Sequence, residues 1–255
     1  MANELWQSRL ASDHGGSDAL EPLLSLALWL AVGRETPVAT ELVRAWCAKP
    51  ILRLAGRRLF GLMRPWLALP ATRAAERGRA FELVRSAARS LEEERAATGP
   101  AEAVELYRVA DAIINQLYFA SGAFGTKGDT ERTPVPAAEG FAAEAFHVIE
   151  ELTEFREPRI VHHMVQTLAH LAPADPRTAF LLVERAVSAG DAYTFDSMAA
   201  NETVTLIARY LADFREIVAT DADVLTAVRR VLDAFVRVGW PAAVTLSYRL
   251  GEAFR

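Results

Sequence analysis

Glutamate and histidine at helical spacing are the first candidates for chemistry in this chain. Glu144 and His147 form a Glu-x-x-His pair, the half-motif that helical di-iron sites use twice. The chain contains no second Glu-x-x-His. Glu151 and Glu154 fall on the same helical face, opposite an apolar face, which indicates a solvated polar stripe. The sequence therefore predicts no metal site at these residues.

His162, His163 and His170 are the second candidate metal cluster. His163 and His170 share one face of a predicted helix, but seven residues separate them by about 10 Å along its axis. Zinc ligands lie about 2 Å from the metal, so these two side chains are not expected to share an ion. His162 and His163 are neighbours that point in different directions. We expect no metal-ligating residue in this segment.

Neither a nucleophile nor a phosphate-binding loop has its usual sequence context. Cys47 lies beside Trp46 on a predicted helix with no histidine near it, and no GxSxG motif is present. The Gly125-Thr126-Lys127 segment lacks the GxxxxGK[ST] spacing of a P-loop and follows a helix instead of a strand. We therefore expect no catalytic residue, no cofactor and no enzymatic activity. An enzyme would require a concave pocket in which histidine and carboxylates converge.

The distribution of arginine gives the clearest functional indication. From Arg44 to Arg89 the chain has eleven basic and two acidic residues, a local charge of +9, whereas Glu139 to Asp223 has fifteen acidic residues and six arginines. Arginines along helices can bind phosphates, and a basic amphipathic helix over 51–69 can lie on an anionic membrane surface. Alternatively, the arginines of this segment are ordinary helix-surface residues that face acidic groups of the same molecule or of a partner. The candidate phosphate- or partner-binding residues are Arg53, Arg57, Arg58, Arg64, Arg73, Arg77 and Arg85.

The whole-chain composition is that of a globular protein. Of the 255 residues, 51% are hydrophobic and 24% are charged, and the single cysteine excludes a disulfide framework. The first residues lack the basic start and apolar core of a secretory signal. The apolar run Leu23 to Val32 has about half the length needed to cross a bilayer, so it is predicted to be a buried helix. A cytoplasmic location is expected.

The N-terminal half is predicted to be helical after a flexible segment, residues 1–17. Asp18 and Glu21 form a capping box, Gly33 ends the first helix, and Pro37 starts the second, so 19–48 is predicted to be a helical hairpin. A helix over 51–69 should be kinked or stopped by Pro65. Longer helices are predicted over 71–97 and 101–121. Residues 18–121 form an N-terminal helical subdomain that contains the basic segment 44–89.

A glycine- and proline-rich segment, 122–136, separates this subdomain from a second one, 137–255. The segment contains few apolar residues and is predicted to be a loop or linker. Beyond it, proline and aspartate begin successive helices, and Leu211 and Phe235 are predicted to be buried. The expected helices cover 137–156, 158–171, 175–190, a segment from Asp196 through Val218, a segment from Asp221 to Gly239, and a last one from Pro241.

Helices of this length with short, proline-punctuated joints resemble HEAT- or armadillo-type repeats, mainly over 137–254. That resemblance implies antiparallel helix pairs stacked as an irregular α-solenoid. The alternative within the predicted all-α class is an irregular multi-helix bundle. The ending, from LIARYLADFRE through FVRVGWPAAVTLSYRLGEAFR, also resembles the C-terminal helical region of long, poorly characterised bacterial proteins. This second resemblance implies an accessory or C-terminal module of a larger bacterial system.

These observations favour a non-catalytic scaffold or adaptor that mediates protein–protein interaction on a helical surface. The alternative is a nucleic-acid-binding accessory domain that uses the arginine-rich helices of 44–89. The overall charge of −5 argues against a general nucleic-acid binder. A protein partner is therefore expected, and the chain lacks a segment long enough to span a membrane.

Overall fold

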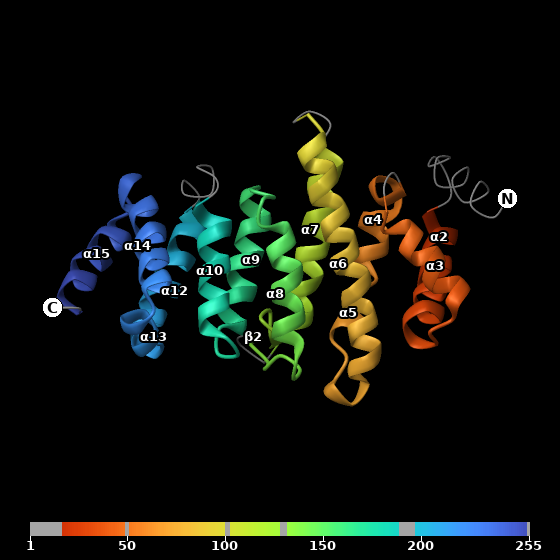
Figure 1. Ribbon diagram of the computed structural model, residues 1–255, viewed down its shortest axis with the longest axis horizontal. Coiled ribbons are helices and arrows are strands. Elements are labelled where there is room, and N and C mark those ends of the chain that lie inside the picture. Colours follow the sequence, from red (N-terminus) through yellow and green to blue (C-terminus); the bar gives the residue numbers. More distant parts are fainter. Residues whose placement is uncertain (1–16, 49–50, 100–102, 128–131, 189–196, 254–255) are drawn as a thin grey trace. The chain divides into compact units, whose positions relative to one another are not determined.

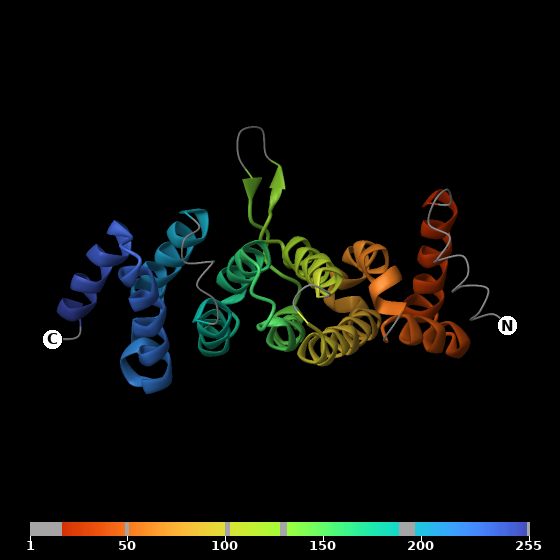
Figure 2. The same ribbon diagram turned by 90° about the horizontal axis from the view of Figure 1, so that it is seen from above.

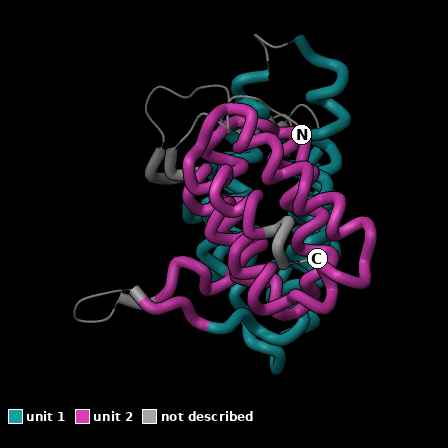
Figure 3. The backbone as a smooth tube through the Cα atoms, turned by 90° about the vertical axis from the view of Figure 1, so that its left-hand side faces the viewer, with its two compact units in different colours: residues 1–120, 136–152 teal, residues 121–135, 153–255 magenta. Residues whose placement is uncertain are grey.

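A computed structural model describes residues 17–48, 51–99, 103–127, 132–188 and 197–253. Most of them are helical, which confirms the predicted all-α class; besides turns and loops, the described residues include one antiparallel pair of two-residue strands. The chain divides into two compact units, residues 1–120 with 136–152 (unit 1) and residues 121–135 with 153–255 (unit 2) (Figure 3). The predicted flexible segment, residues 1–17, lies outside the described residues except for Ser17, which begins the first helix.

Unit 1 is organised around one long helix, α6 (Ala74–Ala97). This helix packs against its neighbours α3 and α4, the short helix α5 and the distant helix α8, and Phe81 meets Phe141 edge-on at a ring-centroid distance of 5.3 Å. The other elements of unit 1 (Figure 1) are α2 (Ser17–Leu28), η1 (Trp29–Gly33), α3 (Pro37–Trp46), α4 (Ile51–Gly61), α5 (Arg64–Leu67), η2 (Ala71–Arg73), α7 (Val104–Ser121) and α8 (Phe141–Leu152).

The position of α8 differs from the predicted domain division. The sequence placed residues 137–156 at the start of the second subdomain, but the structure groups α8 with unit 1 because its apolar face packs on α6. The helix is also shorter than predicted, since Gly140 adopts a φ of 77° just before it begins. A helix distant in sequence thus completes the core of unit 1.

Unit 2 contains the helices that follow. It comprises β1 (Thr126–Lys127), β2 (Arg132–Thr133), α9 (Pro158–Leu171), α10 (Pro176–Ser188), α12 (Ser197–Asp213), α13 (Arg215–Thr220), α14 (Ala222–Arg237) and α15 (Pro241–Ala253). Helix α10 packs against both α9 and α14, and its buried residues are Ala179, Phe180, Leu182, Val183, Ala186 and Val187. Gly190, the predicted end of that helix, lies outside the described residues.

Two predictions for unit 2 need correction. The helix expected to continue through Val218 ends at Asp213, and a short helix, α13, begins after Phe214. Phe235 is fully buried as predicted, but Leu211 is only half-buried because the adjacent Tyr210 occupies the interior, where its hydroxyl donates to the Pro176 carbonyl at 3.0 Å. Among the described helices, none combines the length and apolar character required to cross a membrane.

The predicted loop 122–136 contains an ordered turn at its base. Gly122 has a φ of 88°, and a Cβ there would lie 2.1 Å from the Val135 carbonyl oxygen, so only glycine fits. The Val135 amide donates to the Gly122 carbonyl at 3.0 Å, and β1 pairs with β2 beyond this contact. In Figure 2 the two strands extend away from α9.

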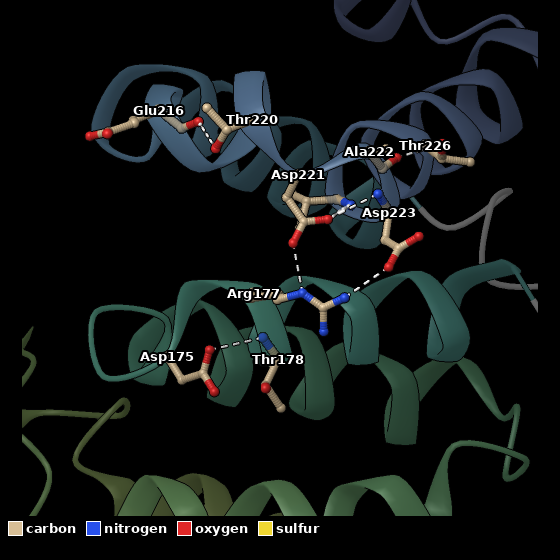
Figure 4. A network of polar contacts seen from close by, with 10 residues as sticks. Asp175, Arg177, Thr178, Glu216, Thr220, Asp221, Ala222, Asp223 and Thr226 are labelled. Atoms are coloured by element: carbon tan, nitrogen blue, oxygen red, sulfur yellow. Dashed lines mark hydrogen bonds and ion pairs between the residues drawn. The ribbon is translucent and has the colours of Figure 1, made fainter.

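A polar network fastens α10 to the start of α14 (Figure 4). Asp221 caps α14 by accepting from the amides of Asp223 and Val224 at 2.9 and 3.2 Å. Arg177 of α10 donates from Nε to Asp221 at 2.7 Å and from Nη2 to Asp223 at 2.8 Å. Asp175 caps α10 in the same way through the Thr178 amide. Aspartates thus cap the N-terminal ends of α10 and α14, as the sequence predicted.

Substitutions of Asp221 separate its role as the N-cap of α14 from its ion pair with Arg177. The hydrogen bond from Arg177, followed by those from the amides of Val224 and Asp223, lowers the pKa of the Asp221 carboxyl below 3.8. Its stabilising contribution is therefore complete above pH 3.8 and is lost as the pH falls through the folded-state value. Asp221→Asn retains an acceptor for the cap but loses the charge, whereas Asp221→Ala loses both.

We expect the urea midpoint at pH 7 to fall in the order wild type, Asp221→Asn, Asp221→Ala. The gap between wild type and Asp221→Asn should narrow as the pH is lowered below 3.8, because the stabilisation by the carboxylate is lost as the group becomes protonated. A difference between the urea midpoints of wild type and Asp221→Asn that stays constant as the pH falls would contradict the assigned ion pair.

Candidate interaction surface

Arg77, one of the predicted phosphate-binding residues, is a structural residue instead. It lies on α6 and is only 4% exposed. Its Nη1 donates to the Leu69 carbonyl at 2.9 Å, and its Nη2 donates to the carbonyl of Glu139, just before α8. The guanidinium therefore joins three separate segments of unit 1 and is inaccessible to a ligand. This burial argues against the expected place of Arg77 in a phosphate- or partner-binding set.

The other predicted arginines whose side chains are described lie on the surface of unit 1 but do not form one cluster. Arg73 hydrogen-bonds to Glu76, Arg85 pairs with Glu82 at 2.6 Å, and the Arg64 guanidinium lies 5.1 Å from the Phe119 ring centroid. Exposed pairs of this kind contribute little to stability and are readily exchanged for other partners. Arg57 and Arg58 are exposed on α4, whereas the Arg53 side chain lies outside the described part of the chain.

The first helix carries an exposed apolar face that the sequence did not predict. Residues Leu23 to Val32 were expected to be a buried helix, but only the side formed by Leu24, Leu28 and their neighbours is buried. Leu23, Leu26 and Trp29 are 39%, 51% and 42% exposed. Figure 2 shows α2 along its length and α6 nearly end-on, so α2 lies across the direction of the central helix of unit 1.

A π-helical turn, η1, ends this apolar face. The Arg34 amide donates to the Trp29 carbonyl at 3.1 Å, a bond that spans five residues instead of four. The Arg34 guanidinium lies over the Trp29 ring, 4.9 Å from its centroid. Such stacking holds the cation at the surface while its N–H groups stay available to an acceptor. We define the α2 surface as Leu23, Leu26, Trp29 and Arg34.

The corner after η1 is held in place by α6. Arg79 donates from Nε to the Val32 carbonyl at 2.9 Å and pairs from Nη1 with Glu35 at 3.2 Å. Glu35 has a φ of 52°, a left-handed conformation that costs energy for any residue with a Cβ. At Gly33 an added Cβ would lie 3.1 Å from the Trp66 ring, so the corner also packs tightly. The position of Trp29 and Arg34 is therefore fixed by specific contacts.

Three arginines surround the Glu76 carboxylate beside the α2 surface. The hydrogen bond from Arg73 lowers the pKa of the Glu76 carboxyl, desolvation opposes this shift, and the charges of Arg73, Arg79 and Arg34 lower it further. Three guanidinium groups are thus close enough to act on one carboxylate. Of these, only Arg73 was among the predicted binding residues. Trp29, Arg34 and Arg79 were missed because their proximity arises from α2, η1 and α6 meeting in space.

The remaining candidates from the sequence do not assemble into a reactive site. His162 Nδ1 lies 3.1 Å from Glu202, which also accepts from Gln166 at 2.7 Å, so these groups join α9 to α12. Burial lowers the pKa of His170, whereas contacts with the Val135 and Ser121 carbonyls raise it, which places this histidine at the base of the β1–β2 turn. His147 is exposed on α8.

Cys47 has the properties of an inert core residue. It is the C-cap residue of α3 and is 1% exposed. Burial raises the pKa of its thiol to about 12, so the thiol stays protonated at neutral pH and supplies no thiolate nucleophile. Throughout the described ranges, no three or more His, Cys, Asp or Glu residues are grouped to hold a metal ion.

Comparison of the chain with protein-family models, with curated proteins and with solved structures finds no match. The function must therefore be inferred from the residues themselves. The α2 surface combines two exposed leucines with a tryptophan and an arginine, and tryptophan and arginine are enriched among the residues that contribute most to binding at protein interfaces.

Arg77→Ala tests whether this arginine is structural. The substitution removes a buried guanidinium and leaves two carbonyls without a donor, so we expect unfolding free energy to fall by about 2–4 kcal/mol in urea denaturation. Arg85→Ala is the matched control on the same helix and should cost under about 1 kcal/mol, because Arg85 makes only an exposed pair. If Arg77→Ala and Arg85→Ala lower the unfolding free energy by the same small amount, Arg77 becomes a binding candidate again.

Substitution at Glu35 measures the strain in the corner. Glu35→Gly and Glu35→Val both remove the pair with Arg79, but only valine keeps a Cβ in the left-handed region. We expect the glycine variant to be more stable than the valine variant by about 1–2 kcal/mol in the same urea experiment. Equal stability of the two variants would show that residue 35 is not held at positive φ in solution.

Proposed function

We propose that this chain is a non-catalytic, helical-repeat scaffold that binds another protein chain through the α2 surface. The observation that carries the proposal is the exposed Leu23–Leu26–Trp29 row with Arg34 stacked at its end. Clustered apolar side chains at a surface are typical of interaction sites, and tryptophan and arginine are enriched among the residues that contribute most to binding. The contacts of Arg79 support the proposal because they reduce the ordering cost of binding.

A HEAT-like stacking of helix pairs is part of this proposal. Within unit 2, α9 packs on α10, α10 on α14 and α14 on α15, and α12 contacts several of them. Each helix therefore uses two faces for its neighbours, as in a stacked array. Within unit 1, α2 contacts η1, α3 and α4, and one of its apolar faces stays exposed.

A binding role accounts for the candidate reactive groups better than a catalytic one. His162 is engaged with Glu202 across two helices, and His170 contacts backbone carbonyls. The Cys47 thiol is protonated and inaccessible. These groups stabilise the fold, so catalysis by them would require a rearrangement of the core.

A nucleic-acid role, the alternative predicted from the arginines, has less support. Arg77 is inaccessible, and Arg73 and Arg85 pair with glutamates of their own helical segments. Phosphate binding requires guanidinium groups that converge along one track. The described arginines of the predicted set are spread over α4, α5, η2 and α6.

Site-directed photo-crosslinking tests the proposal. With p-benzoylphenylalanine at position 29, the full chain in its native cells should give a discrete crosslinked product. The same group at position 147, an exposed aromatic site on α8, is the matched control and should not give that product. Leu26→Asp should remove the product, because a buried carboxylate at an apolar interface is costly.

The product should also form again when the purified components are mixed. Identical products from positions 29 and 147, or a product that Leu26→Asp leaves unchanged, would count against the α2 surface. Circular dichroism of each variant confirms that the helices are retained.

A further inference from the structure

The turn that follows η1, residues 33–36, places a strained conformation on a residue poorly suited to it. We call this turn the η1 corner. Glu35 has a φ of 52°, whereas Gly33, two residues earlier, does not have a positive φ. Helices commonly end at a glycine in the left-handed conformation, because glycine has no Cβ to clash there. The left-handed residue of this corner is thus a glutamate, although a glycine stands at the position where the sequence ends the helix.

Contacts from α6 compensate for this strain. Arg79 donates from Nε to the Val32 carbonyl at 2.9 Å and pairs from Nη1 with Glu35 at 3.2 Å. The Glu35 side chain is 71% exposed, so the pair is open to solvent and contributes little. The hydrogen bond and the pair together contribute about as much as the left-handed conformation of a glutamate costs. A form of the corner that lacks both the strain and these contacts is therefore close in free energy.

We propose that the η1 corner has a second form, in which Gly33 is left-handed and Glu35 is not, and that Arg79 selects the described form. The Arg34 amide already donates to the Trp29 carbonyl at 3.1 Å. A bond of the same span closes a helix that ends at a left-handed glycine, with the donor on the residue after the glycine. The second form therefore keeps this bond. It releases Glu35 from Arg79 and turns the Arg34 side chain off the Trp29 ring.

The form of the corner decides what the α2 surface presents, and this consequence rests on the proposed function. In the described form the Arg34 guanidinium lies over the Trp29 ring, so a partner meets both groups together. In the second form the two groups separate. A partner that requires both binds the described form and shifts the equilibrium toward it. High salt, or a ligand carboxylate that competes for Arg79, weakens its pair with Glu35 and favours the second form.

NMR spectroscopy of the full ¹⁵N-labelled chain, without a partner, tests this inference. The indole N–H of Trp29, assigned by its loss in Trp29→Phe, and the Gly33 amide report the form of the corner, and relaxation dispersion gives the populations. Arg79→Met should raise the population of the second form at least ~fivefold, because it removes both contacts with the corner. Adding Glu35→Gly should lower that population again by ~tenfold, because glycine adopts the left-handed conformation without the penalty.

Two further variants complete the experiment. Arg85→Ala, on the same helix as Arg79, is the control and should leave both signals unchanged, because Arg85 pairs with Glu82 on the surface. Glu35→Val disfavours the described form by a second route, since valine is strained at positive φ. It should shift both signals in the same direction as Arg79→Met.

Unchanged signals in both Arg79→Met and Glu35→Val would overturn the inference. So would an Arg79→Met spectrum that Glu35→Gly does not bring back toward the wild type. If Arg79→Met only loosened the packing, removal of a second side chain would not reverse its effect.

The crosslink from position 29 separates this inference from the proposed function, because the NMR experiment needs no partner. Two forms of the corner without any crosslinked product overturn the proposed function alone. A crosslinked product from a chain whose corner has one form in every variant overturns this inference alone.

Discussion

Backbone carbonyls and amides at helix ends and in the connections between helices need partners outside a helix, and both units of this protein satisfy several of them with charged side chains. In unit 1, two arginines of α6 supply the donors. Arg77 reaches the carbonyls of Leu69 and Glu139, and Arg79 reaches that of Val32. In unit 2, Asp175 and Asp221 cap helices at their N-terminal ends, and Arg177 holds the second cap in place. The packing of the apolar faces depends on these ends being satisfied.

This constraint changes the meaning of the basic segment 44–89. From its composition the segment resembles a phosphate-binding surface, but part of its charge is internal to the fold. Arg77 is enclosed, Arg79 fastens the corner after η1, and Arg89 pairs with Glu151 of α8 at 3.0 Å. The acidic residues and backbone carbonyls that neutralise or engage these groups come from distant parts of the chain. Net charge over a sequence window therefore does not measure the charge available to a ligand.

The α2 surface differs from the sequence prediction in the opposite direction, because residues expected to be buried are exposed. Apart from Arg34 its residues are apolar, and the sequence indicated a buried helix because leucine and alanine occupy all sides of Leu23–Val32. In the structure the neighbours of α2 cover only one side, so Leu26 and Trp29 remain exposed. The π-turn ends at Gly33, and the guanidinium of the next residue, Arg34, stacks on Trp29. The available sequence signal was the width of the apolar arc, which exceeds what a single packed face requires.

Local patterns in the sequence determined the helices and many of their limits. Pro158, Pro176 and Pro241 begin α9, α10 and α15, and Asp221 caps α14, because proline geometry and side-chain capping act within a few residues. The tertiary structure alone decided that α8 belongs with unit 1, that Arg77 is buried and Leu211 only half-buried, and that one face of α2 stays open. These features depend on which faces meet across tens of residues, and helical periodicity states only that a face is apolar, not whether another helix covers it.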